Sequence, residues 1–237
     1  MTAAELSPTQ TLARRLRAGV VIPAHPLALD ADGRFDEAAQ VALTGYYRQA
    51  GAHGVAVGVH TTQFALHDDA GLLRTVWQLA ADAAGSEQIL VAGLVGDTAS
   101  AVDEATQAAE LGYHAVLLSG VGMPAGAPEA ALVQRARAVS EVLPVIGFYL
   151  QEAVGGRRLS VDHWRRLFEV PGVIGVKAAP FDRYRTADVA SAILESDRWQ
   201  EVALLTGNDD TIVWDLLTPF RRTVGGEARE LWFHGGL

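Results

Sequence analysis

Cysteine is absent from the 237 residues, and lysine occurs once, at position 177, beside 18 arginines. The lack of cysteine excludes disulfide bonds and thiolate metal centres. Acidic side chains outnumber basic ones by nine, which argues against nucleic acid or an anionic membrane as the main partner. No apolar run has the length of a membrane span, and residues 1–18 lack the apolar core of a signal peptide. We therefore expect a cytoplasmic protein.

Short apolar runs alternate with helix-like patterns along the chain. The runs that we expect to form strands are 19–24, 54–60, 88–94, 114–118, 144–150, 173–177, 201–206 and 230–234. The patterns that we expect to form helices are 9–17, 35–50, 67–84, 98–111, 128–143, 160–168, 186–196 and 209–217. Apolar strands that alternate with helices indicate parallel pairing with the helices outside. The sequence therefore predicts an α/β fold.

Eight strands spaced by about 25–30 residues are typical of a (β/α)8 TIM barrel, which we predict as a single domain over residues 1–237. The alternative is a doubly wound open sheet, but its G-x-G-x-x-G fingerprint is missing after the first strand. The chain ends at His234-Gly-Gly-Leu237, directly after the expected eighth strand. We therefore expect the last barrel helix and a C-terminal extension to be missing, because the chain is a fragment or because a partner chain completes the barrel.

The single lysine ends the β-branched apolar run Val173-Ile-Gly-Val-Lys177, which is typical of a buried strand. Burial of an ammonium group is costly and lowers its pKa. A lysine in this position can therefore be a neutral amine, the form that attacks a carbonyl and gives a Schiff base. The alternative is a lysine whose side chain extends from the strand end to water.

The active site of such a barrel lies at the C-terminal ends of its strands. Polar residues expected at these ends are His60, Thr61, Thr62, Tyr149, Lys177 and Asn208. A lysine beside threonine and tyrosine hydroxyls suits carbonyl chemistry, because the amine captures the carbonyl and the hydroxyls relay protons. Backbone amides and hydroxyls of the two threonines can hold a carboxylate.

Four segments, in order along the chain, carry a further pattern. They are Gly19-Val-Val-Ile-Pro-Ala24 with the turn Asp32-Gly-Arg-Phe-Asp36, then Gly58-Val-His-Thr-Thr62, Leu143-Pro-Val-Ile-Gly-Phe-Tyr149 and Gly172-Val-Ile-Gly-Val-Lys177. Together they resemble the dihydrodipicolinate synthase and N-acetylneuraminate lyase family of Schiff-base aldolases. The resemblance implies that Lys177 condenses with pyruvate or another 2-oxo acid for C–C bond formation or cleavage. It also implies a homo-oligomer that needs no cofactor.

Three segments depart from the family pattern. Gln63-Phe64 stands in place of Gly-Glu, the segment 120–124 lacks an interface tyrosine, and the segment 150–157 lacks the Asn-x-Pro form. Arg157 remains a candidate ligand for a substrate carboxylate. These departures keep open a catalytically altered barrel that serves as a binding or assembly subunit. A dehydratase or hydratase-lyase acting on a sugar acid or an aromatic substrate is a further alternative.

The catalytic tyrosine of the family has two candidates here. An ungapped match from Pro144 places Phe148 at the tyrosine position and Tyr149 one residue beyond it. Residues two apart share a strand face, and Gly147 precedes Tyr149 as Gly175 precedes Lys177. If these glycines leave space inside the barrel, Tyr149 points inward as Lys177 does, and we predict this arrangement. Phe148 pointing inward would remove the phenol from the site.

Histidines 25, 60 and 67 are the candidates for a metal site. No H-x-H or H-E-x-x-H motif accompanies them, so we predict no metal. His60 is the histidine that we expect to face the substrate. Arg183, soon after the lysine, and Asn208 are further candidates to contact its anionic or polar groups.

Overall fold

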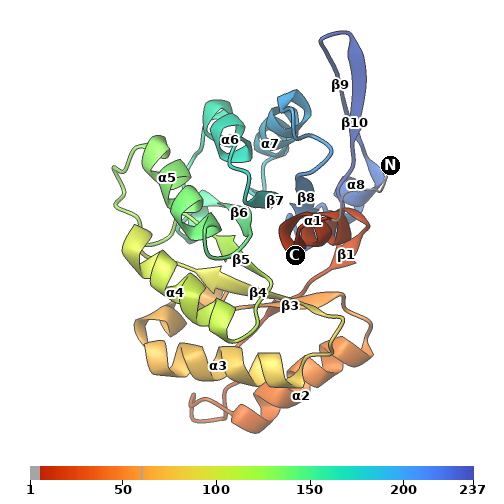
Figure 1. Ribbon diagram of the computed structural model, residues 1–237. Helices are drawn as coiled ribbons and strands as arrows, with labels where there is room; N and C mark the ends of the chain where they lie inside the picture. The colour runs from red at the N-terminus through yellow and green to blue at the C-terminus, as the bar shows by residue number, and fades with distance from the viewer. Residues whose placement is uncertain (1–5, 60) are drawn as a thin grey trace.

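The computed structural model describes residues 6–59 and 61–237, with side chains from residue 64 onward after the gap. At its centre parallel strands form a ring (Figure 1). The first strand has two parts, of which β1 (Val20–Val21) pairs with β11 (Gly235–Gly236) and β2 (Ala24–His25) pairs with β3 (Gly54–Val57). The first strand is thus hydrogen-bonded to β11 through its first part and to β3 through its second part, and this closes the sheet into a barrel. The remaining barrel strands are β4 (Ile89–Leu94), β5 (Ala115–Leu118), β6 (Val145–Leu150), β7 (Val173–Ala179) and β8 (Ala203–Thr206).

Helices surround this ring, which confirms the predicted (β/α)8 barrel (Figure 1). They are α2 (Glu37–Gln49), α3 (Ala70–Ala83), α4 (Thr98–Glu110), α5 (Glu129–Ser140), α6 (Val161–Phe168), α7 (Arg183–Glu195) and the short α8 (Ile212–Leu217). Five of these helices begin at a residue whose side-chain oxygen accepts a hydrogen bond from a backbone N–H of the first turn. These capping residues are Asp36, Asp69, Asp97, Ser160 and Asp182. The cap at Asp69 starts α3 three residues later than predicted, after the 3-10 helix η1 (Thr61–Asp68). None of the helices within the described ranges is long and apolar enough to cross a membrane.

Two hydrophobic clusters fill the barrel and its outer layer. Side chains alternate between the strand faces, so Ile146, Ile174 and Leu205 belong to the inner cluster, while their strand neighbours pack against the helices. The leading helix α1 (Pro8–Arg17) adds Leu12, Ala13 and Leu16 to the inner cluster. Arg17 Nη1 donates to the carbonyl oxygen of Val202, just before β8, at 3.0 Å. The helix therefore covers the amino-terminal end of the barrel and leaves the opposite end for a site.

The prediction of the eighth strand at 230–234 is wrong. Residues Glu227–Leu231 form β10, which pairs in antiparallel fashion with β9 (Phe220–Val224) in a separate hairpin. Gly225 and Gly226, at φ values of 56° and 87°, make its turn. The eighth barrel strand is β11, two glycines long. A Cβ at Gly235 would lie 1.8 Å from the carbonyl oxygen of Val20, so only glycine can close the barrel there.

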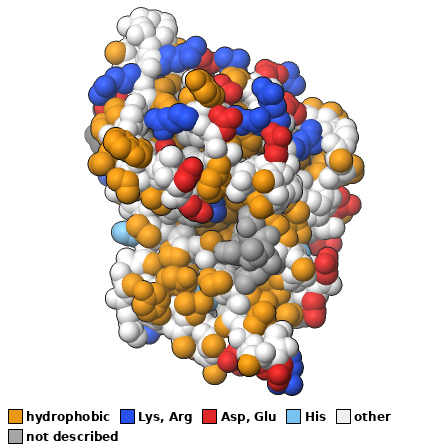
Figure 2. Space-filling model, turned by 180° about the vertical axis from the view of Figure 1, so that it is seen from behind, with side chains coloured by type: hydrophobic (Ala, Val, Ile, Leu, Met, Phe, Trp, Pro, Cys, Tyr) orange, Lys and Arg blue, Asp and Glu red, His pale blue; other side chains and the backbone are white. Residues whose placement is uncertain are grey.

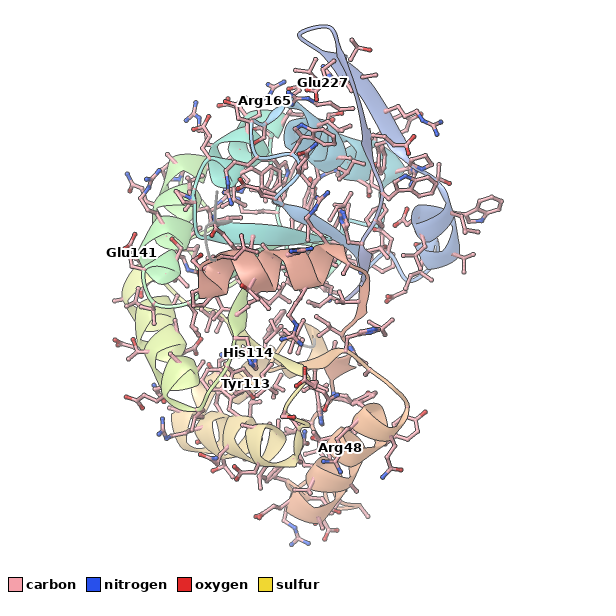
Figure 3. All side chains as sticks on the ribbon, turned by 45° about the vertical axis from the view of Figure 1, so that its right-hand side comes forward. Arg48, Tyr113, His114, Glu141, Arg165 and Glu227 are labelled. Carbon is pink, nitrogen blue, oxygen red and sulfur yellow. The ribbon has the colours of Figure 1, made fainter. Side chains whose placement is uncertain are left out.

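Ion pairs attach the β9–β10 hairpin to the outer helices. Glu195 at the end of α7 pairs with Arg165 of α6 and with Arg222 of β9. Arg165 and the hairpin residue Glu227 lie at the same end of the molecule (Figure 3). In the view from behind, acidic and basic side chains gather over this end (Figure 2). The hairpin thus occupies the outer layer beside α7.

Candidate active site

Lys177 lies inside the barrel, at a point where two neighbouring strands make room for it. Its side chain is 8% exposed, and its Nζ lies 4.6 Å from the ring centroid of Phe148, its partner in the β6–β7 register. On the other side Gly207 follows β8, and a Cβ there would lie 2.6 Å from Lys177 Cε. The burial predicted for the lysine is confirmed. The sequence places Gly207 after the strand that precedes it but gives it no role, whereas this packing requires its small size.

Burial controls the charge of the Lys177 amine. Removal from water lowers its pKa from 10.5 to about 8, and the negative charge of Asp209 opposes this effect. Within the described part of the chain no carboxylate forms an ion pair with the amine. At pH 7 a group with this pKa is neutral in roughly a tenth of the molecules, far more than a solvated lysine. The site therefore holds a primary amine that can act as a nucleophile near neutral pH.

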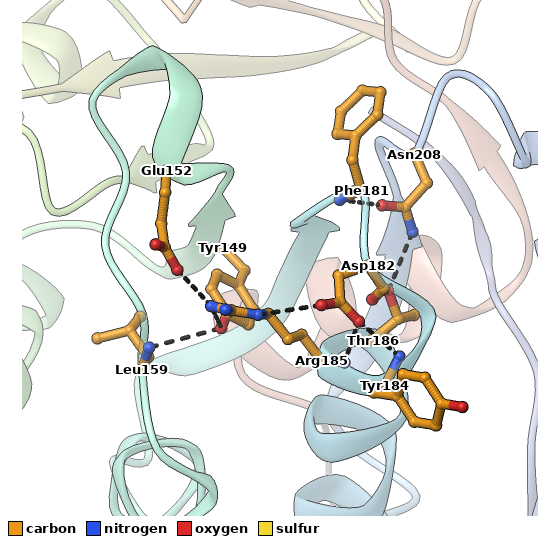
Figure 4. Close-up of polar contacts among 9 residues, drawn as sticks. All are labelled: Tyr149, Glu152, Leu159, Phe181, Asp182, Tyr184, Arg185, Thr186 and Asn208. Carbon is orange, nitrogen blue, oxygen red and sulfur yellow. Dashed lines mark hydrogen bonds and ion pairs between the residues drawn. The ribbon is translucent and has the colours of Figure 1, made fainter.

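The inward orientation predicted for Tyr149 is wrong. Tyr149 belongs to the outer cluster and packs on Trp164 of α6, with ring centroids 5.0 Å apart. Its hydroxyl accepts a hydrogen bond from Arg185 Nη1 at 3.4 Å, outside the barrel (Figure 4). Gly147 does share a strand face with Tyr149. A Cβ at Gly147 would lie 3.0 Å from the side chain of Leu167, so the absence of a side chain at Gly147 makes room for α6. Phe148 faces Lys177 instead.

A buried polar network holds the two loops that flank the lysine. Asp215 of α8 is fully buried and accepts from Thr206 Oγ1 at 2.7 Å, Asn208 Nδ2 at 2.9 Å and Arg183 Nη1 at 2.7 Å. Asn208 Oδ1 accepts a hydrogen bond from the backbone N–H of Phe181 at 3.0 Å (Figure 4). Phe181 has a positive φ of 52°. The network joins the loops after β7 and β8. The substrate-binding role of Arg183 and Asn208 stays a prediction, because here both side chains bind Asp215.

The remaining candidates lie on the segment after β3 and beside β6. His60 lies outside the described residues. Thr61 and Thr62 begin η1, but their side chains are outside the described set, so all three roles stay predictions. Arg157 lies against Gly120, since a Cβ on Gly120 would be 3.8 Å from Arg157 Cδ. Arg157 also lines a separate cavity next to α5 and α6. Its role toward a substrate carboxylate also stays a prediction.

The two described candidate histidines have partners within the protein. His25 Nε2 lies 2.8 Å from Thr44 Oγ1, behind the first strand. His67 Nε2 lies 2.8 Å from the carbonyl oxygen of Gly58, and its Nδ1 lies 2.8 Å from Glu104 Oε1. Burial opposes protonation of His67, but Glu104, the carbonyl of Gly58 and the charge of Asp68 together outweigh this effect and raise its pKa. Both histidines therefore fix loops of the barrel rather than face its centre.

The chain belongs to the dihydrodipicolinate synthetase family, whose sequence model matches residues 18–219. None of the curated proteins matches the sequence.

Solved structures with the same fold include two kinds of enzyme. A dihydrodipicolinate synthase from Bacillus anthracis is 20% identical, with a TM-score of 0.71 over 83% of this chain and 65% of that protein. The dihydrodipicolinate synthase from Acinetobacter baumannii, solved with pyruvate, is 21% identical, with a TM-score of 0.74 over 93% and 69%. N-acetylneuraminate lyase from Mycoplasma synoviae is 18% identical, with a TM-score of 0.68 over 85% and 66%. The chain thus spans less than two thirds of the length of the first of these proteins.

Replacement of Lys177 by Met should raise the free energy of unfolding at pH 7, by up to about 3 kcal/mol, since the cost of a buried ammonium disappears. Between pH 8 and 10.5 the unfolded state of the natural protein binds more protons than the folded state. Its stability should therefore rise with pH across this window, and that of Lys177→Met should not. Urea unfolding at pH 7 and 9.5 measures both effects.

Lys177→Arg is the control, because it keeps a buried charge that does not titrate in this range. It should be less stable than the natural protein at both pH values. A Lys177→Met protein that is less stable at pH 7 and keeps the natural pH dependence would contradict the assignment of a buried amine with a lowered pKa.

Proposed function

We propose that the protein is a Schiff-base lyase or aldolase that captures pyruvate or another 2-oxo acid on Lys177. The observation that carries this proposal is the burial of a single lysine whose pKa is lowered to about 8 at the carboxyl-terminal end of a barrel strand. That end is where enzymes of this fold place their chemistry. The pyruvate complex of the related Acinetobacter synthase supports the choice of substrate class.

The reaction follows from the position of the amine. The neutral Lys177 Nζ attacks the C2 carbonyl of the 2-oxo acid and forms a carbinolamine, which takes up a proton and loses water to give an iminium ion. Loss of a proton or of a carbon fragment from C3 then gives an enamine, because the iminium accepts the electron pair. The enamine either takes up a proton or attacks an aldehyde, and hydrolysis returns the free amine.

Phe148 has a defined part in this scheme. Its ring face lies beneath the Lys177 nitrogen, so its π electrons stabilise the positive charge of the ammonium and of the iminium that replaces it. The ring carries no proton that could be transferred. Thr61 and Thr62 are proposed to hold the substrate carboxylate and to relay protons, and His60 is proposed to face the substrate.

The second candidate function is a small-molecule-binding or assembly subunit with the barrel fold. The observation that favours it is the phenyl ring of Phe148 beside the lysine, where a phenol would serve as proton relay. A dehydratase or hydratase-lyase remains within the proposed chemistry. We also propose that the protein is cytoplasmic and that it forms a homo-oligomer, the latter on the resemblance alone.

Borohydride reduction in the presence of pyruvate should link one pyruvate-derived group to Lys177. Peptide mass spectrometry should locate it there, and the only competing amine is that of the N-terminus, since no second lysine exists. Lys177→Arg should give no adduct at this peptide. An absence of adduct with pyruvate and with a panel of other 2-oxo acids, on folded protein, would sink the aldolase proposal.

Replacement of Phe148 by Tyr should place a hydroxyl near the Schiff base and accelerate proton transfer at C3. The exchange of pyruvate methyl protons for deuterium, followed by NMR, should rise by roughly 10²-fold. Phe148→Leu is the control, because it removes the ring without adding a hydroxyl, and it should give no acceleration. Equal exchange rates in all three proteins, with trapping at Lys177 intact, would show that Phe148 does not limit this step.

A further inference from the structure

A second cluster of buried polar groups lies outside the barrel centre, between the strands β5 and β6 and the helices α5 and α6. These elements surround a cavity of about 40 Å³. It has room for roughly three waters, or for the few heavy atoms of one small ion. Lys177 is not among the residues that line it.

The buried side-chain nitrogens that lack a hydrogen-bond partner in the described part of the chain all belong to residues lining this cavity. They are Arg135 Nε and Nη2, Arg157 Nη1, His163 Nδ1 and Trp164 Nε1. Arg135, His163 and Trp164 are 1%, 4% and 1% exposed. Buried polar groups are normally hydrogen-bonded, and each exception needs an explanation. Here one occupant of the cavity explains all of them.

Most of the unpartnered groups that line this cavity are donors. Arginine nitrogens and the indole nitrogen can only donate hydrogen bonds. His163 differs, because burial lowers its pKa to about 4 and its other ring nitrogen bonds the backbone of Glu129, so its Nδ1 donates only when the ring is charged. Arg135 is anchored on one side only, where its Nη1 donates to the carbonyl oxygen of Ser119 at 2.6 Å. The occupant must therefore accept several hydrogen bonds, and two of its donors carry a positive charge.

Nearby carboxylates do not supply this acceptor. Glu129 acts on Arg157 and His163 through its charge, but its oxygens accept from the backbone and hydroxyl of Ser160. Asp97 and Glu104 act on Arg135 through their charges without a hydrogen bond to it. They offset part of the positive charge and leave the donors unpaired.

We propose that this cavity is a binding site for a small oxyanion, held by Arg135 and Arg157 with Trp164 as a further donor and His163 in its lining. Guanidinium groups present paired N–H donors that match the geometry of phosphate or carboxylate oxygens. Such an ion connects the loop after β5, which carries Gly120, with the segment after β6, which carries Arg157. Lys177 does not line this site, although Phe148 lies both in its lining and against the lysine.

Inorganic phosphate is the probe, titrated into the whole protein at constant ionic strength with a bulky organic anion as balancing salt. Calorimetry should show saturable binding at one site, and the melting temperature should rise with phosphate concentration. NMR of ¹⁵N-labelled histidine should show a shift of the His163 signals, since the ion lies against its ring. The same binding should occur in Lys177→Met, which separates this site from the barrel centre.

Arg157→Gln removes one charge at a half-buried position and should weaken phosphate binding at least about tenfold. Arg135→Gln should do the same if it folds. Arg137→Gln is the matched control, because it makes the same change on the exposed face of α5, the helix that carries Arg135. It should leave the phosphate affinity within about twofold of the natural value. Equal affinity in Arg157→Gln and Arg137→Gln, loss of binding in Lys177→Met, or weak non-saturable binding of an adventitious ion only would each overturn the proposal.

Discussion

The burial of the Lys177 ammonium is the constraint on which the candidate site depends. A charge removed from water is destabilising unless it is paired, and here a phenyl ring and a distant carboxylate replace the missing ion pair. The folded state tolerates this unfavourable free energy because β7 is hydrogen-bonded to a strand on each side and packs on both faces against hydrophobic clusters. The result is an amine whose pKa is lowered by its position in the barrel.

Glycine and a buried carboxylate make that position possible. Gly207 lets the loop after β8 approach the lysine side chain, and Asp215 ties this loop to the one after β7 through Asn208. Gly235 allows the last strand to reach the first. Each of these residues acts through close approach or hydrogen bonding, so the lysine depends on contacts between segments that are far apart in the sequence.

The barrel could be predicted from the sequence, because seven of its strands are apolar runs between amphipathic helices. The eighth could not, since β11 is two glycines long and the predicted run before it begins with residues of the hairpin, up to Leu231. Lys177 could be found by its uniqueness and burial. The orientation of Tyr149 was assigned wrongly, because a glycine on a strand makes room on either face and here it admits a helix. The donors around Arg135 come together only in the folded chain.

A direct titration of the lysine tests the central claim. Protein labelled with ¹³C at lysine Cε contains one labelled residue, so its NMR signal reports Lys177 without assignment work. A midpoint near pH 8 would establish that burial lowers the pKa of Lys177, as the packing against Phe148 and Gly207 requires. A midpoint at or above 10.5 would show a solvated ammonium and contradict the account of the site.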